Sequence, residues 1–161
     1  MRRLLSSILL AGLMTNPALS ASTTVFGSSD AQECYLATKL PGQISDIRAC
    51  NDALRYDNLG SRDKAATYIN RGIHHTRSGN HSAALADFES ALELNPELAE
   101  AFLNRGNTYI FLGNFTDALA EYERALELGT KDPHAAYFNK GLAYEAMRNL
   151  TKAYELSLIH I

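Results

Sequence analysis

Apolar residues recur at steps of three and four along the middle of the chain, which is the period of an α-helix with one buried face. The pattern breaks at Ser78-Gly79-Asn80 and then resumes, so it predicts two amphipathic helices joined by a tight turn. Ser82 stands where it would cap the second helix, and Pro96 ends that helix. The apolar positions are Tyr68, Gly72, His75, Ala84, Leu85, Phe88, Ala91 and Leu92.

A five-residue phrase recurs with this pattern. "YINRG" at 68–72 corresponds to "FLNRG" at 102–106 and to "YFNKG" at 137–141, so the intervals are 34 and 35 residues. "ALEL" also occurs twice, and Leu112-Gly113-Asn114 followed by Thr116 repeats the first turn and its expected cap. A fixed period of this length indicates a repeat architecture in which each unit stacks on the next.

These residues resemble the tetratricopeptide repeat family, with Arg71, Arg105 and Lys140 where that family has leucine. The resemblance implies an all-α fold, namely a right-handed α-solenoid of stacked antiparallel helix pairs. Units are expected at 65–98 and 99–133, with a partial unit at 134–155. The matching positions are Tyr68, Gly72, Ala84, Phe88, Ala91 and Pro96 in the first unit, and Phe102, Gly106, Tyr109, Ala118, Tyr122 and Ala125 in the second.

Residues 1–21 have the pattern of a secretory signal peptide. Arg2 and Arg3 give a cationic start, residues 4–14 are apolar, and small residues allow cleavage after Ser20 or Ala21. The apolar run is too short to span a membrane, and no second such run follows. We expect a bacterial protein that is periplasmic or secreted.

The two cysteines, Cys34 and Cys50, flank a Pro-Gly turn at 41–42. In an oxidising compartment such a pair usually forms a disulfide, so we expect residues 22–62 to form an N-terminal cap of two stapled helices, near 29–38 and 44–56. Closing this loop stabilises the fold by about 3 kcal/mol in the chain-entropy model. A redox-active pair and a metal site are the alternatives, but a CxxC spacing is absent and no histidine lies between the cysteines.

The repeat pattern fails at residues 156–161, which read "LSLIHI". Ser157 stands where an aromatic residue is due, and His160 stands where alanine is due. These residues can be encoded by a transposon end used in sequencing-library adaptors, so we interpret them as an adaptor-derived tail and expect the native gene to continue. The alternative is a divergent C-terminal helix.

Little in the composition points to catalysis. The formal net charge of −3 becomes about −5 without the two signal arginines, which gives no electrostatic case for nucleic acid or anionic lipid. No phosphate loop, GxSxG or HExxH motif occurs, and His74, His75 and His81 lack a supporting ligand set. We predict no enzymatic activity, no cofactor and no metal site.

The asparagine of the repeated phrase is the candidate ligand-binding residue. The family resemblance implies that first helices line a concave groove and that Asn70, Asn104 and Asn139 point into it, similar to an asparagine ladder that holds a peptide backbone. The alternative is that each asparagine bonds a neighbouring unit and orders the superhelix. The predicted peptide-binding set is Asn70, Ile73, Arg77, Asn104, Asn107, Phe111, Asn139 and Leu142.

The sequence thus predicts a non-catalytic module that binds an extended segment of a protein or peptide partner in the cell envelope. Two alternatives remain at this stage. One is a structural subunit that self-associates through the ends of its repeats. The other is the N-terminal part of a larger envelope or secretion protein.

Overall fold

Eight helices make up the described part of the chain, residues 29–39 and 47–159, and no strand occurs there. The structure is a computed structural model. The predicted signal peptide and residues 160–161 of the predicted tail lie outside the described residues, whereas residues 156–159 fall within the last helix. The helices are α1 (Ser29–Thr38), α2 (Arg48–Tyr56), α3 (Ser61–Arg77), α4 (His81–Leu94), α5 (Ala99–Phe111), α6 (Phe115–Glu127), α7 (Pro133–Ala146) and α8 (Leu150–Ile159).

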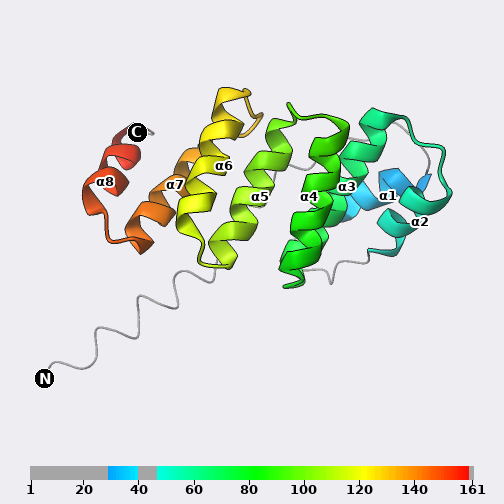
Figure 1. Ribbon diagram of the computed structural model, residues 1–161, viewed down its shortest axis with the longest axis horizontal. Coiled ribbons are helices and arrows are strands. Elements are labelled where there is room, and N and C mark those ends of the chain that lie inside the picture. The colour runs from blue at the N-terminus through cyan, green and yellow to red at the C-terminus, as the bar shows by residue number, and fades with distance from the viewer. Residues whose placement is uncertain (1–28, 40–46, 160–161) are drawn as a thin grey trace, which may run out of the picture.

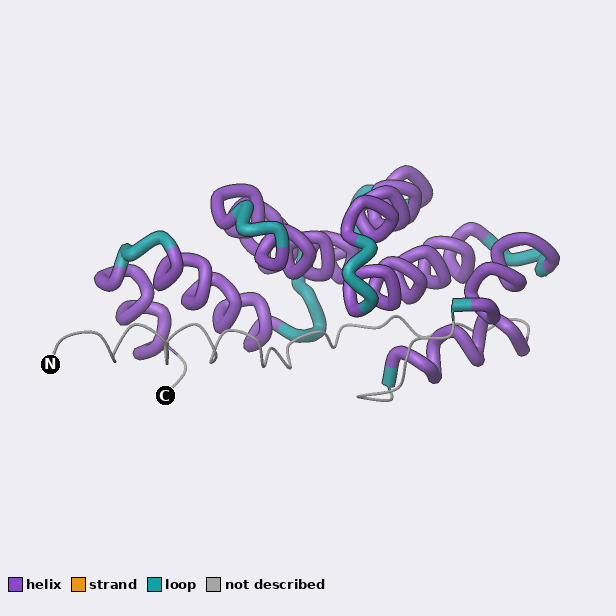
Figure 2. Tube along the Cα trace, turned by 90° about the horizontal axis from the view of Figure 1, so that it is seen from below, coloured by secondary structure: helices purple, strands orange, loops and turns teal. Residues whose placement is uncertain are grey.

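The helices form antiparallel pairs that follow one another along the molecule, with α1 and α2 at one end and α7 and α8 at the other (Figure 1). Each pair packs mainly within itself, and its first helix also contacts the first helix of the next pair, as α3 does with α5 and α5 with α7. Figure 2 shows the same succession from below. The predicted all-α stack of helix pairs is confirmed.

The predicted turn residues mark the ends of the helices correctly, whereas the predicted capping residues do not. Gly79 and Gly113 have φ values of 77° and 75°, a left-handed conformation that ends the first helix of each pair. In the third pair Arg148 takes this conformation with a φ of 59°. The prediction that Ser82 and Thr116 cap the second helices is wrong. The N-cap residues of α4 and α6 are instead Asn80 and Asn114, whose side chains make no capping hydrogen bond.

Each full pair has its own apolar core, closed by a small residue from the next pair. Phe88 fills the first core, and Ala101 of α5 completes it. Tyr122 fills the second core, and Ala136 of α7 completes it. Burial of each core therefore depends on the following pair, which is why repeats of this kind are stable only when stacked.

The N-terminal cap is a disulfide-linked pair of helices held on α3. Cys34 of α1 and Cys50 of α2 form the predicted disulfide and are 16 positions apart in the sequence. Arg71 of α3 donates to Asn51 Oδ1 of α2 at 2.9 Å, and Arg77 donates to the Thr38 carbonyl of α1 at 2.8 Å. Polar side chains of α3 thus form hydrogen bonds to both helices of the cap.

None of the described helices combines the length and apolar character needed to cross a membrane.

Candidate protein-interaction surfaces

The three asparagines of the repeated phrase lie inside the stack. Asn70 and Asn104 are fully buried and Asn139 is 1% exposed. The expectation that they point into an open groove is wrong, because their face of each first helix is covered by a neighbouring helix. A ligand cannot touch these side chains without separating packed helices. Their burial favours the alternative in which they order the stack.

Asn107 shows how this ordering works between α5 and α7. Its Oδ1 accepts hydrogen bonds from Asn139 Nδ2 at 2.7 Å and from the Tyr122 hydroxyl at 2.9 Å. Burial raises the pKa of Tyr122, so the hydroxyl keeps its proton and remains a donor. One amide oxygen therefore links α5, α6 and α7. The predicted peptide-binding role of Asn107 conflicts with its 1% exposure.

A second polar contact joins the neighbouring first helices α3 and α5. The hydroxyls of Thr76 and Thr108 lie 2.8 Å apart, and both residues are buried. Asn104 uses its amide differently, donating to the Glu100 carbonyl one turn earlier at 2.8 Å. The two buried hydroxyls thus serve packing between units, whereas the Asn104 amide is bonded within α5 itself.

Two ion pairs between an arginine of a first helix and an acid of its second helix were not predicted from the sequence. Arg71 donates to both carboxylate oxygens of Asp87, at 2.9 and 2.7 Å, and this hydrogen bonding to Asp87 is the main cause that raises the Arg71 pKa. Arg105 and Glu121 form the matching pair at 2.9 Å in the second unit. The signal was present in the sequence, because each cation and acid are separated by the same interval. These pairs explain why arginine stands at the family's leucine position.

The other predicted contact residues have different environments. Ile73 is fully buried in the first core, so its predicted ligand contact is not open to a partner in this structure. Leu142 is partly buried. Arg77 and Phe111 are exposed and occupy the same register position at the ends of α3 and α5. Of the predicted contact residues, Arg77, Phe111 and Leu142 are thus accessible to a partner in the structure.

An apolar surface lies where the first helices of the second and third units end. Phe111, Leu112 and Met147 are 44%, 44% and 46% exposed. Met147 and residues 113–117 line a cavity of about 410 Å³ between the two units. The ring of His81 stacks on Phe111 at 5.8 Å, which extends this surface toward the first unit. We call Phe111, Leu112 and Met147 the turn surface.

A larger apolar cleft lies between α7 and α8. Its volume is about 460 Å³. It is lined by His134, Tyr137, Phe138, Gly141, Leu142, Glu145, Ala153 and Leu156. Most of these side chains are apolar, and Phe138 is 54% exposed. We call this feature the α7–α8 cleft.

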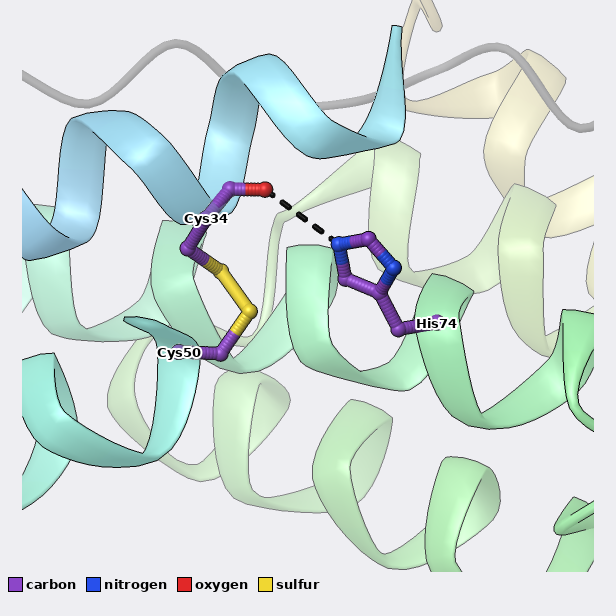
Figure 3. A group of neighbouring side chains, drawn as sticks. All are labelled: Cys34, Cys50 and His74. Carbon is purple, nitrogen blue, oxygen red and sulfur yellow. Dashed lines mark hydrogen bonds between the residues drawn. A yellow bond between two sulfur atoms is a disulfide. The ribbon is translucent and has the colours of Figure 1, made fainter. Parts of the chain in front are cut away.

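One group of potential metal ligands occurs among the described residues, namely Cys34, Cys50 and His74, whose ligand atoms lie within 4.8 Å of one another (Figure 3). The sulfurs are joined in a disulfide, which removes the thiolates that a metal would need. His74 Nε2 lies 3.3 Å from the Cys34 carbonyl oxygen. The histidine thus acts as a further tie between α3 and the cap.

Comparison with known proteins supports the repeat assignment. Residues 75–139 match a family model described as tetratricopeptide repeat. The crystal structure of MamA has a TM-score of 0.55 and 24% sequence identity, and the match covers 82% of this chain and 80% of that chain. It is one of 19 matching chains among solved structures. A search of curated proteins finds no match.

The family match begins near the end of α3, covers all of α4 to α6 and ends within α7, so it includes the second copy of the repeated phrase and the turns at Gly79 and Gly113. The solved structure extends the agreement in fold to most of the chain. Repeats of this kind present stacked helices as surfaces for other proteins. Residues 75–139 therefore resemble tetratricopeptide repeats, and the fold of stacked helix pairs extends over most of the chain.

Proposed function

We propose that the protein is an exported, non-catalytic interaction module that binds an extended segment of a partner protein along the turn surface. The observation that carries the proposal is that half-exposed apolar side chains lie where the first helices of two successive units end. Phe111, Leu112 and Met147 each leave more than two fifths of their surface in water. Exposed apolar surface of this kind marks interaction sites on soluble proteins.

The chemistry of the partner follows from what surrounds this surface. Phe111 and Met147 offer apolar anchors, while Arg77 occupies the register position of Phe111 one unit earlier. The partner segment that fits these residues has apolar side chains over the second and third units and an acidic residue near Arg77 of the first unit. The Thr76–Thr108 contact holds α3 and α5 together one turn away, so the surface is preformed.

Export is supported by the signal-like residues 1–21 and by the Cys34–Cys50 disulfide, since disulfides persist in oxidising compartments. The proposal therefore places the mature protein in a bacterial periplasm or outside the cell. N-terminal sequencing of the protein recovered from the envelope fraction tests this point. A mature chain starting at Ala21 or Ser22 is expected, and an intact Met1 in the cytoplasm would contradict export.

The binding surface is tested by replacing Phe111 and Met147 together with serine. Protein purified with and without these changes is used to capture partners from envelope extract, and the captured protein is identified and then purified. We expect the double variant to bind it at least tenfold more weakly, because apolar anchors dominate such interfaces. Leu36→Ser is the matched control, since Leu36 is 50% exposed on α1 at the far end of the stack. Equal binding by all three proteins would refute the turn surface.

A further inference from the structure

Two cysteines and a histidine from three different helices meet where the cap packs on the repeats. Cys34 of α1, Cys50 of α2 and His74 of α3 place their ligand atoms within 4.8 Å of one another (Figure 3). All three side chains are fully buried. The sequence does not announce this group, because His74 lies outside the loop that the cysteines close and reaches them through the packing of α3 against the cap. A disulfide needs only the two sulfurs, whereas the three side chains together are a metal-ligand set.

We propose that reduction of the disulfide turns Cys34, Cys50 and His74 into a binding site for one zinc ion. Thiolate sulfur and imidazole nitrogen are ligands that zinc prefers, and three protein ligands with a water in the fourth position is a coordination that zinc sites use. Zinc–ligand bonds of about 2.0–2.3 Å in a tetrahedron separate the ligand atoms by roughly 3.5–3.8 Å. Since the ligand atoms already lie within 4.8 Å of one another, small movements bring them onto one ion.

The charge of this ligand set fits a divalent ion in a buried place. Two thiolates and a neutral imidazole offset the two positive charges of Zn²⁺, so the complex has no net charge. Neutrality matters here because all three side chains are fully buried, and an uncompensated charge in such surroundings is costly. A monovalent thiophilic ion such as Cu⁺ would leave one negative charge over. The site therefore favours Zn²⁺.

A thiol–disulfide exchange supplies the free ligands. A dithiol, such as the active-site pair of an oxidoreductase, transfers two electrons and two protons to Cys34 and Cys50, so that their S–S bond breaks and the dithiol closes to a disulfide. Because both sulfurs are fully buried, the cap has to loosen before the dithiol reaches them. Zn²⁺ then displaces the two thiol protons, which leave to solvent.

Zinc would connect helices that the disulfide leaves separate. The disulfide joins α1 to α2, whereas His74 belongs to α3, so the ion would bind the cap to the repeats directly. His74 Nε2 already lies 3.3 Å from the Cys34 carbonyl oxygen, so the ring faces α1 before any ion binds. The site is independent of the proposed function, because no residue of the turn surface belongs to this group.

Zinc titration of the full chain tests the site. The protein is reduced with a phosphine, which adds no thiol ligand, and a chromophoric chelator serves as the competitor. We expect the reduced wild type to bind one Zn²⁺ per chain, and the oxidised protein to bind it at least about a hundredfold more weakly, since it has no thiolate. His74→Gln should weaken binding by about a hundredfold or more, because even the loss of a group that supports a ligand costs ten- to a hundredfold.

His75→Gln is the matched control. His75 is the next residue of α3 and lies 3.9 Å from Asp87, outside the ligand group, so its change should leave zinc affinity as in the wild type. Affinity in the wild type should rise with pH while the thiols are still protonated, because each ion displaces two protons. Zinc should also raise the melting temperature of the reduced wild type, since it binds the folded cap.

The proposal is overturned if the reduced chain binds no zinc, whether or not its helical signal survives reduction. It is also overturned if folded His74→Gln binds zinc as tightly as the wild type, or if the oxidised protein does. Where His74→Gln does not fold, His74→Cys decides, because a thiolate at this place should still hold the ion. Loss of zinc binding by folded His74→Cys would then refute the site.

Discussion

At the residue scale, the three glycines of the repeated phrase have unequal surroundings. Gly72 and Gly106 each lie under an aromatic ring, whereas among the described side chains none lies within 4 Å of a Cβ added at Gly141. Packing against Phe88 and Tyr122 therefore requires glycine in the first two units. Each ring comes from a residue 16 positions later, on the partner helix.

We expect Gly72→Ala to destabilise the fold by about 1–3 kcal/mol, because the new methyl group overpacks a fully buried core against Phe88. Gly141→Ala should instead stabilise by about 0.5–1 kcal/mol, because alanine is the better helix former and its Cβ meets no described side chain within 4 Å. Urea denaturation measures both changes in the free energy of unfolding. Equal effects of the two changes would show that the surroundings of the two glycines are alike.

Asn107 should matter more for stability than for binding. Asn107→Ala removes the acceptor for Tyr122 and Asn139 and leaves two buried donors unsatisfied, so we expect a loss of about 2–4 kcal/mol. Asn114→Ala is the control, because Asn114 is exposed and makes no side-chain cap bond. Its change should cost less than about 0.5 kcal/mol. Thermal denaturation followed by circular dichroism distinguishes the two, and partner capture at low temperature should be unaffected in both variants.

The sequence could not reveal the burial of these asparagines. The prediction that the asparagines face a groove rests on the family resemblance, which implies that first helices line a concave surface. The partners of Asn107 come from α6 and α7, which only the folded stack brings together. Arg71 and Asp87 were different, because their spacing recurs at Arg105 and Glu121 and was readable in advance.

At the element scale, the helix pairs and their Gly-centred turns were predictable because periodic apolar positions and glycine both act locally. The bounds of α1 agree with the predicted 29–38, and α2 ends at Tyr56 as expected. The caps of α4 and α6 were not predictable, since each helix begins at the first residue after the turn rather than at a capping side chain.

The cap is the element whose stability depends most on a covalent link. Cys34→Ser combined with Cys50→Ser should cost about 3 kcal/mol, because the loop between the cysteines gains conformational freedom in the unfolded chain. The ties from Arg71, His74 and Arg77 to the cap remain, so the helical signal of α3 to α8 should persist. Thermal melting with and without reductant measures this. Reductant should lower the melting temperature of the wild type and leave the double variant unchanged.

At the scale of the whole molecule, the stack has unlike ends. The cap covers α3 with a disulfide-linked helix pair, and α7 and α8 present an apolar cleft. The cysteines before the repeats predicted the disulfide-linked cap. The α7–α8 cleft was not predicted, because it depends on how the side chains of two helices come together in the folded stack.

The Cys34–Cys50 disulfide has a consequence for how the cap can separate from the repeats. The covalent link joins α1 to α2 and joins neither of them to α3. Only packing and the contacts from Arg71, His74 and Arg77 hold the cap on α3 (Figure 1). Local opening of this end should therefore release α1 and α2 together as one unit, leaving the repeats in place.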